Sequence, residues 1–154
     1  MVFLSIFRKS KNVSVIPLNG IIAPNMGRRK GLNLSEIDKN IEQAFSVKNL
    51  NAVALQINSP GGSPVQSEMI ANRIRELSDK NSIPVLAFVE DVAASGGYWL
   101  ACAADEIFAS KASIVGSIGV VSAGFGFDKA IEKIGIDRRL YTSGNNKAIL
   151  DPFL

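Results

Sequence analysis

Residues 91–99 read Asp-Val-Ala-Ala-Ser-Gly-Gly-Tyr-Trp, a serine set among small residues and followed at once by two glycines. The apolar run 98–104 overlaps its end and predicts a helix that begins beside Ser95. The hydroxyl of Ser95 would then lie at a helix N-terminus, where the following backbone N–H can face an oxyanion. The chain contains no histidine, so a Ser-His-Asp triad is excluded and a nucleophilic Ser95 needs a different base.

Hydrophobic patterning around this stretch alternates between short strands and helices. A strand is predicted just before it at 83–89, and helices are predicted after Ser35, from Pro64 to Asp79 and over 128–134. Strands separated by helices at this spacing favour a parallel or mixed α/β sheet with right-handed crossovers. The further predicted strands are 13–18, 52–57, 106–109 and 138–142.

Two of the predicted helices begin with capping residues. Ser35 with Asp38 is a variant of the capping box, and Ser63 with Pro64 and Gln66 is a fuller one. Apolar residues at helical spacing define the faces that we expect to be buried. In the first helix these are Ile37, Ile41, Ala44 and Phe45, and in the second Val65, Met69, Ile70, Ile74 and Leu77.

Length and composition indicate one globular domain, residues 13–154, preceded by a short basic arm, residues 1–12. The chain has 154 residues, of which 47% are hydrophobic and 20% are charged. Cys102 is the single cysteine and is expected to be a small core residue, so no disulfide and no metal cluster are predicted. Tyr98 and Trp99 are also expected to pack in the core.

Positive charge is concentrated near the N-terminus. Residues 1–35 hold six basic residues and no acidic one, although the formal net charge of the chain is only +3. Such a segment can attract anionic lipid, with Phe3, Ile6 and Phe7 entering the interface beside it. The apolar run Val2–Phe7 is too short for a signal peptide core or a transmembrane helix, and no base-reading motif supports nucleic-acid binding. We therefore expect a cytoplasmic protein with at most peripheral membrane contact.

Two strand-to-helix turns, residues 59–62 and 94–97, have the composition of an oxyanion site. They read Ser-Pro-Gly-Gly and Ala-Ser-Gly-Gly. Glycine lets the backbone approach a ligand closely, and two convergent N–H groups form an oxyanion hole. We expect the N–H groups of Gly62 and Gly96 to be these donors. Such turns would also suit a thioester oxyanion, so an acyl-CoA enzyme of the crotonase type is an alternative, although no acidic pair is positioned near them.

Without histidine, the base for Ser95 has to come from a lysine. A lysine with the ordinary pKa near 10.4 is almost wholly protonated at neutral pH, and removal from water lowers that pKa. Lys147 has small, uncharged neighbours and is the expected base, with an ordinary surface lysine as the alternative reading. The lysines that lie near acids or on charged faces, and are therefore expected to be solvated, are Lys80, Lys111, Lys129 and Lys133.

Ser117 lies in the stretch Gly-Ser-Ile-Gly, which is otherwise apolar. A buried hydroxyl needs a hydrogen-bond partner, so Ser117 either orients the lysine or bonds to neighbouring backbone. No glycine-rich motif with the spacing of a nucleotide site follows, and no cluster of metal-ligating residues is present in the sequence. We expect neither a cofactor nor a metal.

Four segments in this order resemble the signal peptide peptidase A family of serine proteases, in its short form without a transmembrane anchor. They are residues 57–62 (INSPGG), 93–98 (AASGGY), 115–120 (VGSIGV) and 142–147 (TSGNNK). The resemblance runs from about Val13 to the end, and the missing histidine agrees with that family's Ser–Lys dyad. It implies an α/β fold of the crotonase-like, Clp-protease-like class, a superhelix of β-β-α units.

The resemblance also implies a role for each residue of the site. Ser95 matches the nucleophile, Lys147 the general base and Ser117 the serine that orients the lysine, while Gly62 and Gly96 match the oxyanion donors. It implies a homo-oligomeric ring in which the serine and the lysine of one site come from neighbouring copies. The substrates would be signal peptides or other unfolded apolar peptides, bound extended along a strand edge.

Domains of this family continue into further helices, whereas seven residues follow Lys147 here. The sequence therefore predicts a serine endopeptidase, a hydrolase acting through an acyl-enzyme, that is truncated at its C-terminus. The alternative is a catalytically inert paralogue or fragment that serves only as a binding or assembly module.

Overall fold

The computed structural model describes residues 11–25, 31–144 and 146–153. The chain divides into two compact units, Met1–Gly119 and Val120–Leu154, which are described separately. Nearly all of the predicted arm 1–12, including Phe3, Ile6 and Phe7, lies outside the described residues, as do the basic residues 28–30.

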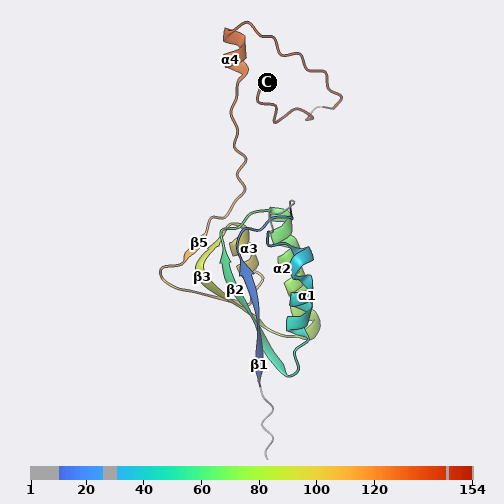
Figure 1. The fold of residues 1–154 in the computed structure, drawn as a ribbon, viewed down its shortest axis with the longest axis vertical. Coiled ribbons are helices and arrows are strands. Elements are labelled where there is room, and N and C mark those ends of the chain that lie inside the picture. The colour runs from blue at the N-terminus through green and yellow to red at the C-terminus, as the bar shows by residue number, and fades with distance from the viewer. Residues whose placement is uncertain (1–10, 26–30, 145, 154) are drawn as a thin grey trace, which may run out of the picture. The chain divides into compact units, whose positions relative to one another are not determined.

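The first unit is built on a parallel sheet (Figure 1). Its strand order is β1 (Asn12–Asn19), β2 (Leu50–Ser59), β3 (Val85–Ala94) and β4 (Glu106–Ala109). A short β5 (Ile114–Gly116) pairs with the last residues of β3. Every pair is parallel, which confirms the predicted sheet and brings the C-terminal ends of β2 and β3 to one edge.

Helices connect the strands and bury one face of the sheet. They are α1 (Leu34–Phe45), α2 (Pro64–Asn81) and the short α3 (Gly96–Ala101), and α1 and α2 lie side by side in Figure 1. Large apolar side chains from the helices pack against those of the strands, because burying them removes apolar surface from water. The largest fully buried ones in this core are Ile16, Leu18, Ile22, Ile41, Leu55, Ile57, Ile70, Ile74 and Leu100.

The caps of α1 and α2 differ in part from the prediction. Asn33, not Ser35, caps α1: its Oδ1 accepts hydrogen bonds from the Glu36 N–H at 3.2 Å and from the Ser35 hydroxyl at 2.6 Å. Asn33 takes this role because it is buried and its amide is also tied to the preceding loop. Ser63 caps α2 as predicted.

Gln66 does not close the predicted capping box. Its Oε1 accepts the Leu34 N–H at 3.0 Å and so links the starts of the two helices. The N–H of Ser63, which the box would have used, donates instead to the Ile22 carbonyl at 2.7 Å. The first turn of α2 is therefore tied both to α1 and to the segment that follows β1.

Several side chains expected in the core are exposed. Val65 and Met69 are 61% and 42% exposed, because the buried stripe of α2 runs through Ser67, Ile70, Ala71, Ile74, Leu77 and Ser78 and passes beside them. Trp99, which is 44% exposed, and Cys102, also exposed, lie on the outer side of α3 and its C-cap, whose inner residues are Gly96, Gly97, Leu100 and Ala101.

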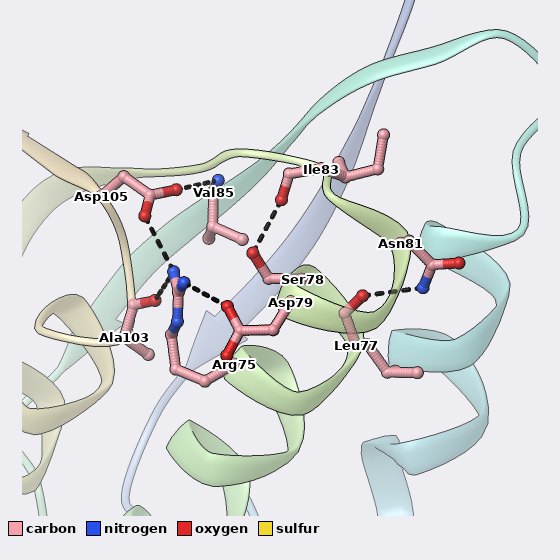
Figure 2. A network of polar contacts seen from close by, with 9 residues as sticks. All are labelled: Arg75, Leu77, Ser78, Asp79, Asn81, Ile83, Val85, Ala103 and Asp105. Carbon is pink, nitrogen blue, oxygen red and sulfur yellow. Dashed lines mark hydrogen bonds and ion pairs between the residues drawn. The ribbon is translucent and has the colours of Figure 1, made fainter.

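Polar contacts brace the opposite end of α2 (Figure 2). The Arg75 guanidinium donates to Asp79 at 2.7 Å, to Asp105 at 2.9 Å and to the Ala103 carbonyl at 3.3 Å. The other carboxylate oxygen of Asp105 accepts the Val85 N–H at 2.8 Å, so one carboxylate joins α2 to the start of β3. That N–H lowers the pKa of Asp105 most, and Arg75 lowers it further against the opposing effect of partial burial.

The second unit contains α4 (Asp128–Lys133), as predicted. The predicted strand 138–142 is wrong: these residues are irregular, because a strand needs a hydrogen-bonded neighbour and none pairs with them in the described part of this unit. Arg138 is instead ion-paired with Asp151 at 2.6 Å and lies over the Phe153 ring. No helix in the described ranges has the length and apolar character needed to span a bilayer.

Candidate active site

The two glycine-containing turns at the ends of β2 and β3 lie against each other. A Cβ added to Gly61 would lie 2.6 Å from the Ala94 carbonyl oxygen and 2.7 Å from the Gly96 nitrogen. No side chain fits between backbones this close, which is why glycine is required there. The parallel sheet thus brings together two turns that are more than 30 residues apart in sequence.

Ser95, the residue directly before α3, has a strained backbone conformation. Its φ is 52° and its ψ is −119°, a combination that costs a non-glycine residue about 1–3 kcal/mol. Its N–H donates to the Gly116 carbonyl at 2.8 Å, and its own carbonyl accepts from the Trp99 N–H at 3.0 Å. The side chain is half-buried and forms no capping hydrogen bond, so the hydroxyl is not committed to the helix.

Gly62 and Gly96, the predicted oxyanion donors, belong to these two turns. Gly96 is the first residue of α3, where a backbone N–H has no partner within the helix. Gly62 has a φ of 146°, and a Cβ there would lie 2.0 Å from the Ile22 carbonyl oxygen. Within the described residues, neither N–H takes part in a hydrogen bond. Both groups meet the first requirement of a donor to an external oxyanion, and their role stays a prediction.

The segment after β1 supports the first turn. Ile22 donates its N–H to the Gly61 carbonyl at 2.9 Å and accepts the Ser63 N–H at 2.7 Å, so it forms a bridge across Gly62. Ile22 also forms an isolated bridge with Leu32. The conformation of Gly62 is therefore set by residues far from it in sequence.

Ser117 comes directly after β5, one residue beyond the carbonyl that holds Ser95. It is exposed and has a φ of 53°, again an unusual value for a non-glycine residue. The structure places it in the same unit as Ser95, and its predicted contact with a lysine stays a prediction.

Lys147 belongs to the second unit and is exposed in a turn, four positions before Asp151 in the sequence. Its pairing with Ser95 therefore stays a prediction. In the described residues no group of three or more His, Cys, Asp or Glu side chains is arranged to hold a metal ion.

Two buried serines near the turns were not singled out from the sequence. Ser59 and Ser67 are both 0% exposed, and each has its hydroxyl bonded to a backbone carbonyl. The sequence signal for Ser59 is its position at the end of an apolar strand, directly before Pro-Gly-Gly. Ser67 carried no such signal, because its contact with Gly96 arises only when α2 and α3 pack together; a Cβ on Gly96 would lie 2.3 Å from its Oγ.

Comparison with known proteins gives one family and several relatives. Residues 78–153 match the family model of peptidase family S49. The chain is 53% identical over 142 residues to a protein of Brucella melitensis named Na(+)/H(+) antiporter NhaA, covering 92% of this chain and 19% of that protein. It is 31% identical over 147 residues to the putative signal peptide peptidase SppA of Enterococcus faecium, covering 93% of this chain and 42% of that protein.

Two further matches concern a plant protease and a solved structure. Over 113 residues the chain is 40% identical to the chloroplastic serine protease SPPA of Arabidopsis thaliana, covering 71% of this chain and 16% of that protein. A mutant of the 1510-N membrane-bound stomatin-specific protease superposes with a TM-score of 0.55 and 21% identity, covering 76% of this chain and 52% of that one. This likeness confirms the predicted α/β fold class. The chain spans less than half the length of each of the three curated relatives named here.

Proposed function

The chain belongs to peptidase family S49, and on that premise we propose that it carries the nucleophile, oxyanion donors and base of a serine peptidase. The observation that supports this most is Ser95, held in a strained turn beside Gly61 and at the start of a helix. Its substrates would be signal peptides or other unfolded apolar peptides. Ion transport is not part of the proposal, because the chain matches only 19% of the antiporter.

The proposed reaction begins with proton transfer from the Ser95 hydroxyl to the neutral amine of Lys147. The Ser95 Oγ bonds to the carbonyl carbon of the peptide, and the N–H groups of Gly62 and Gly96 hold the resulting oxyanion. Lys147 then gives the proton to the leaving amine as the C–N bond breaks and an acyl-enzyme remains. Water, losing a proton to Lys147, releases the acyl group and restores Ser95.

Lys147 can act as a base only in its neutral form, which burial favours. It is exposed in the isolated chain. The proposal therefore includes a homo-oligomer in which a neighbouring copy covers Lys147. The Ser95 and the Lys147 of one site then come from two different copies. Apolar side chains of the second unit support such an assembly, since Val121, Phe125 and Leu150 are 89%, 81% and 80% exposed. A cytoplasmic, membrane-peripheral location stays a prediction.

The test is cleavage of a fluorogenic apolar peptide by an oligomeric preparation of the chain. Ser95→Ala and Lys147→Ala should each reduce kcat/KM by about a thousandfold or more, because the two groups act as one unit. Lys129→Ala, which removes an exposed lysine from α4 of the same unit, should leave it unchanged. Cleavage by either dyad variant at the rate of the native sequence would overturn the mechanism.

The alternative is an inert binding or assembly module, and the exposure of Lys147 is the observation that favours it. A serine-directed fluorophosphonate separates the two readings. Labelling of Ser95 that Lys147→Ala abolishes supports the peptidase, whereas an unlabelled chain that still binds apolar peptide supports the inert module.

A further inference from the structure

Ser59, the last residue of β2, joins three segments through its hydroxyl. The Oγ donates to the Gly20 carbonyl at 2.7 Å and accepts the Gly61 N–H at 3.1 Å. The residue is 0% exposed, so it has no access to a substrate and cannot itself be a nucleophile. Its hydroxyl bonds fix the start of the turn that contains Gly62 relative to the end of β1.

The backbone of Ser59 meets the second turn. A Cβ added to Gly97 would lie 2.3 Å from the Ser59 carbonyl oxygen, so the start of α3 rests directly on this residue. Ser59 also pairs with Ala93 immediately after a shift in the β2–β3 register. One residue therefore touches the turn of Gly62 through its hydroxyl and the turn of Gly96 through its carbonyl.

We propose that Ser59 is a positioning residue that sets the separation of the Gly62 and Gly96 N–H groups. The proposal rests on the proposed function. An oxyanion needs both donors within about 2.7–3.1 Å of a single oxygen. Gly61 and Gly62 have φ values of 93° and 146° and no side chains to restrain them, while Pro60 has no N–H. The hydrogen bond from the Gly61 N–H to Ser59 is thus a direct restraint on this turn. It acts together with the backbone hydrogen bonds that Ile22 forms on either side of Gly62.

Ser78 provides a matched control. It is 4% exposed, and its hydroxyl donates to the Ile83 carbonyl at 2.7 Å, far along α2 from the glycine turns (Figure 2). Ser59→Ala and Ser78→Ala each delete one buried hydroxyl bonded to a backbone carbonyl. We expect both variants to lower the Tm, and Ser59→Ala to lower it more, because only the Ser59 hydroxyl also accepts a backbone N–H.

The two variants should differ in catalysis. Ser59→Ala should lower kcat about ten- to a hundredfold with little change in KM, a smaller effect than loss of a whole oxyanion donor. Ser78→Ala should keep the native kcat. Equal kcat values for the two variants, measured at a temperature where both are folded, would overturn the proposal.

A second measurement does not depend on activity. In amide NMR spectra, Ser59→Ala should shift the signals of both Gly62 and Gly96, although Gly96 lies on the other turn, while Ser78→Ala should shift neither. If the native chain neither cleaves peptide nor is labelled at Ser95, the proposed function fails. The Gly62 and Gly96 amide signals would still show whether Ser59 restrains the two turns. Unmoved Gly62 and Gly96 signals in Ser59→Ala would refute it.

Discussion

Ser95 holds a backbone conformation that almost every residue except glycine avoids. Its hydroxyl makes no capping hydrogen bond that would offset the cost of this strain. The packing of Gly61 against the Ser95 peptide maintains the strained conformation. The sequence predicts the serine, its helix and the glycines around it. It does not predict the φ of 52°, because that angle results from contact between two turns that meet only in the folded sheet.

Replacement of Ser95 by glycine and by alanine should therefore give different stabilities. Both changes remove the hydroxyl, but only glycine adopts this conformation without strain. We expect Ser95→Gly to be about 1 kcal/mol more stable than Ser95→Ala in urea unfolding. At Ser78, inside α2, the order should reverse, because glycine is the poorer helix former. A Ser95→Ala variant at least as stable as Ser95→Gly would contradict the strain.

At the scale of the elements, periodicity predicted the existence of α1, α2 and α4 and of β1 to β4. Periodicity failed where contacts between distant parts of the chain determine which residue caps a helix or which face is buried. Asn33 displaces Ser35 as a cap because the loop before it is held by the same side chain. Met69 lies outside the buried stripe of α2, which includes the small polar residues Ser67 and Ser78 that apolar periodicity leaves out.

The brace between α2 and β3 makes the fold sensitive to acid. The pKa of Asp105 is lowered below its ordinary 3.8 in the folded state. The folded protein therefore binds fewer protons there than the unfolded chain, and stability rises with pH across this range. This contribution is fully present above the ordinary pKa and disappears as the pH falls through the folded one.

Asp105→Asn should accordingly be less stable than the native chain at pH 7 and lose less stability between pH 5 and pH 3. Chemical unfolding at a series of pH values measures this difference. Glu68→Gln is the control, since Glu68 forms no ion pair with any described residue. Parallel pH profiles for Asp105→Asn and the native chain would exclude this carboxylate as a source of acid sensitivity.

At the scale of the whole molecule, the residues proposed for the site belong to two different units of the chain. Ser95, Gly62, Gly96 and Ser117 belong to the first, and Lys147 belongs to the second. Four separated motifs were enough to predict the family. The surroundings of Lys147 were not predictable, because small neighbours in sequence do not determine burial: the residue is exposed in the single chain.

Mixing two inactive variants tests whether neighbouring copies share the site. Ser95→Ala subunits retain Lys147, and Lys147→Ala subunits retain Ser95. If a serine and a lysine from different copies form one site, oligomers assembled from both variants should recover up to about a quarter of the native activity, while each variant alone stays inactive. Absence of recovery in mixed oligomers, with their assembly confirmed by mass, would restrict the dyad to one chain.

The order of the two units along the chain has a consequence for synthesis. A ribosome adds about 5–20 residues per second, and N-terminal units fold first. Ser95 precedes Lys147 by 52 positions, a delay of about 3–10 s at that rate. The proposed nucleophile and the proposed oxyanion turns are therefore made before the proposed base of the same chain. On the proposed mechanism, a nascent chain has no complete dyad of its own until residue 147 has been added.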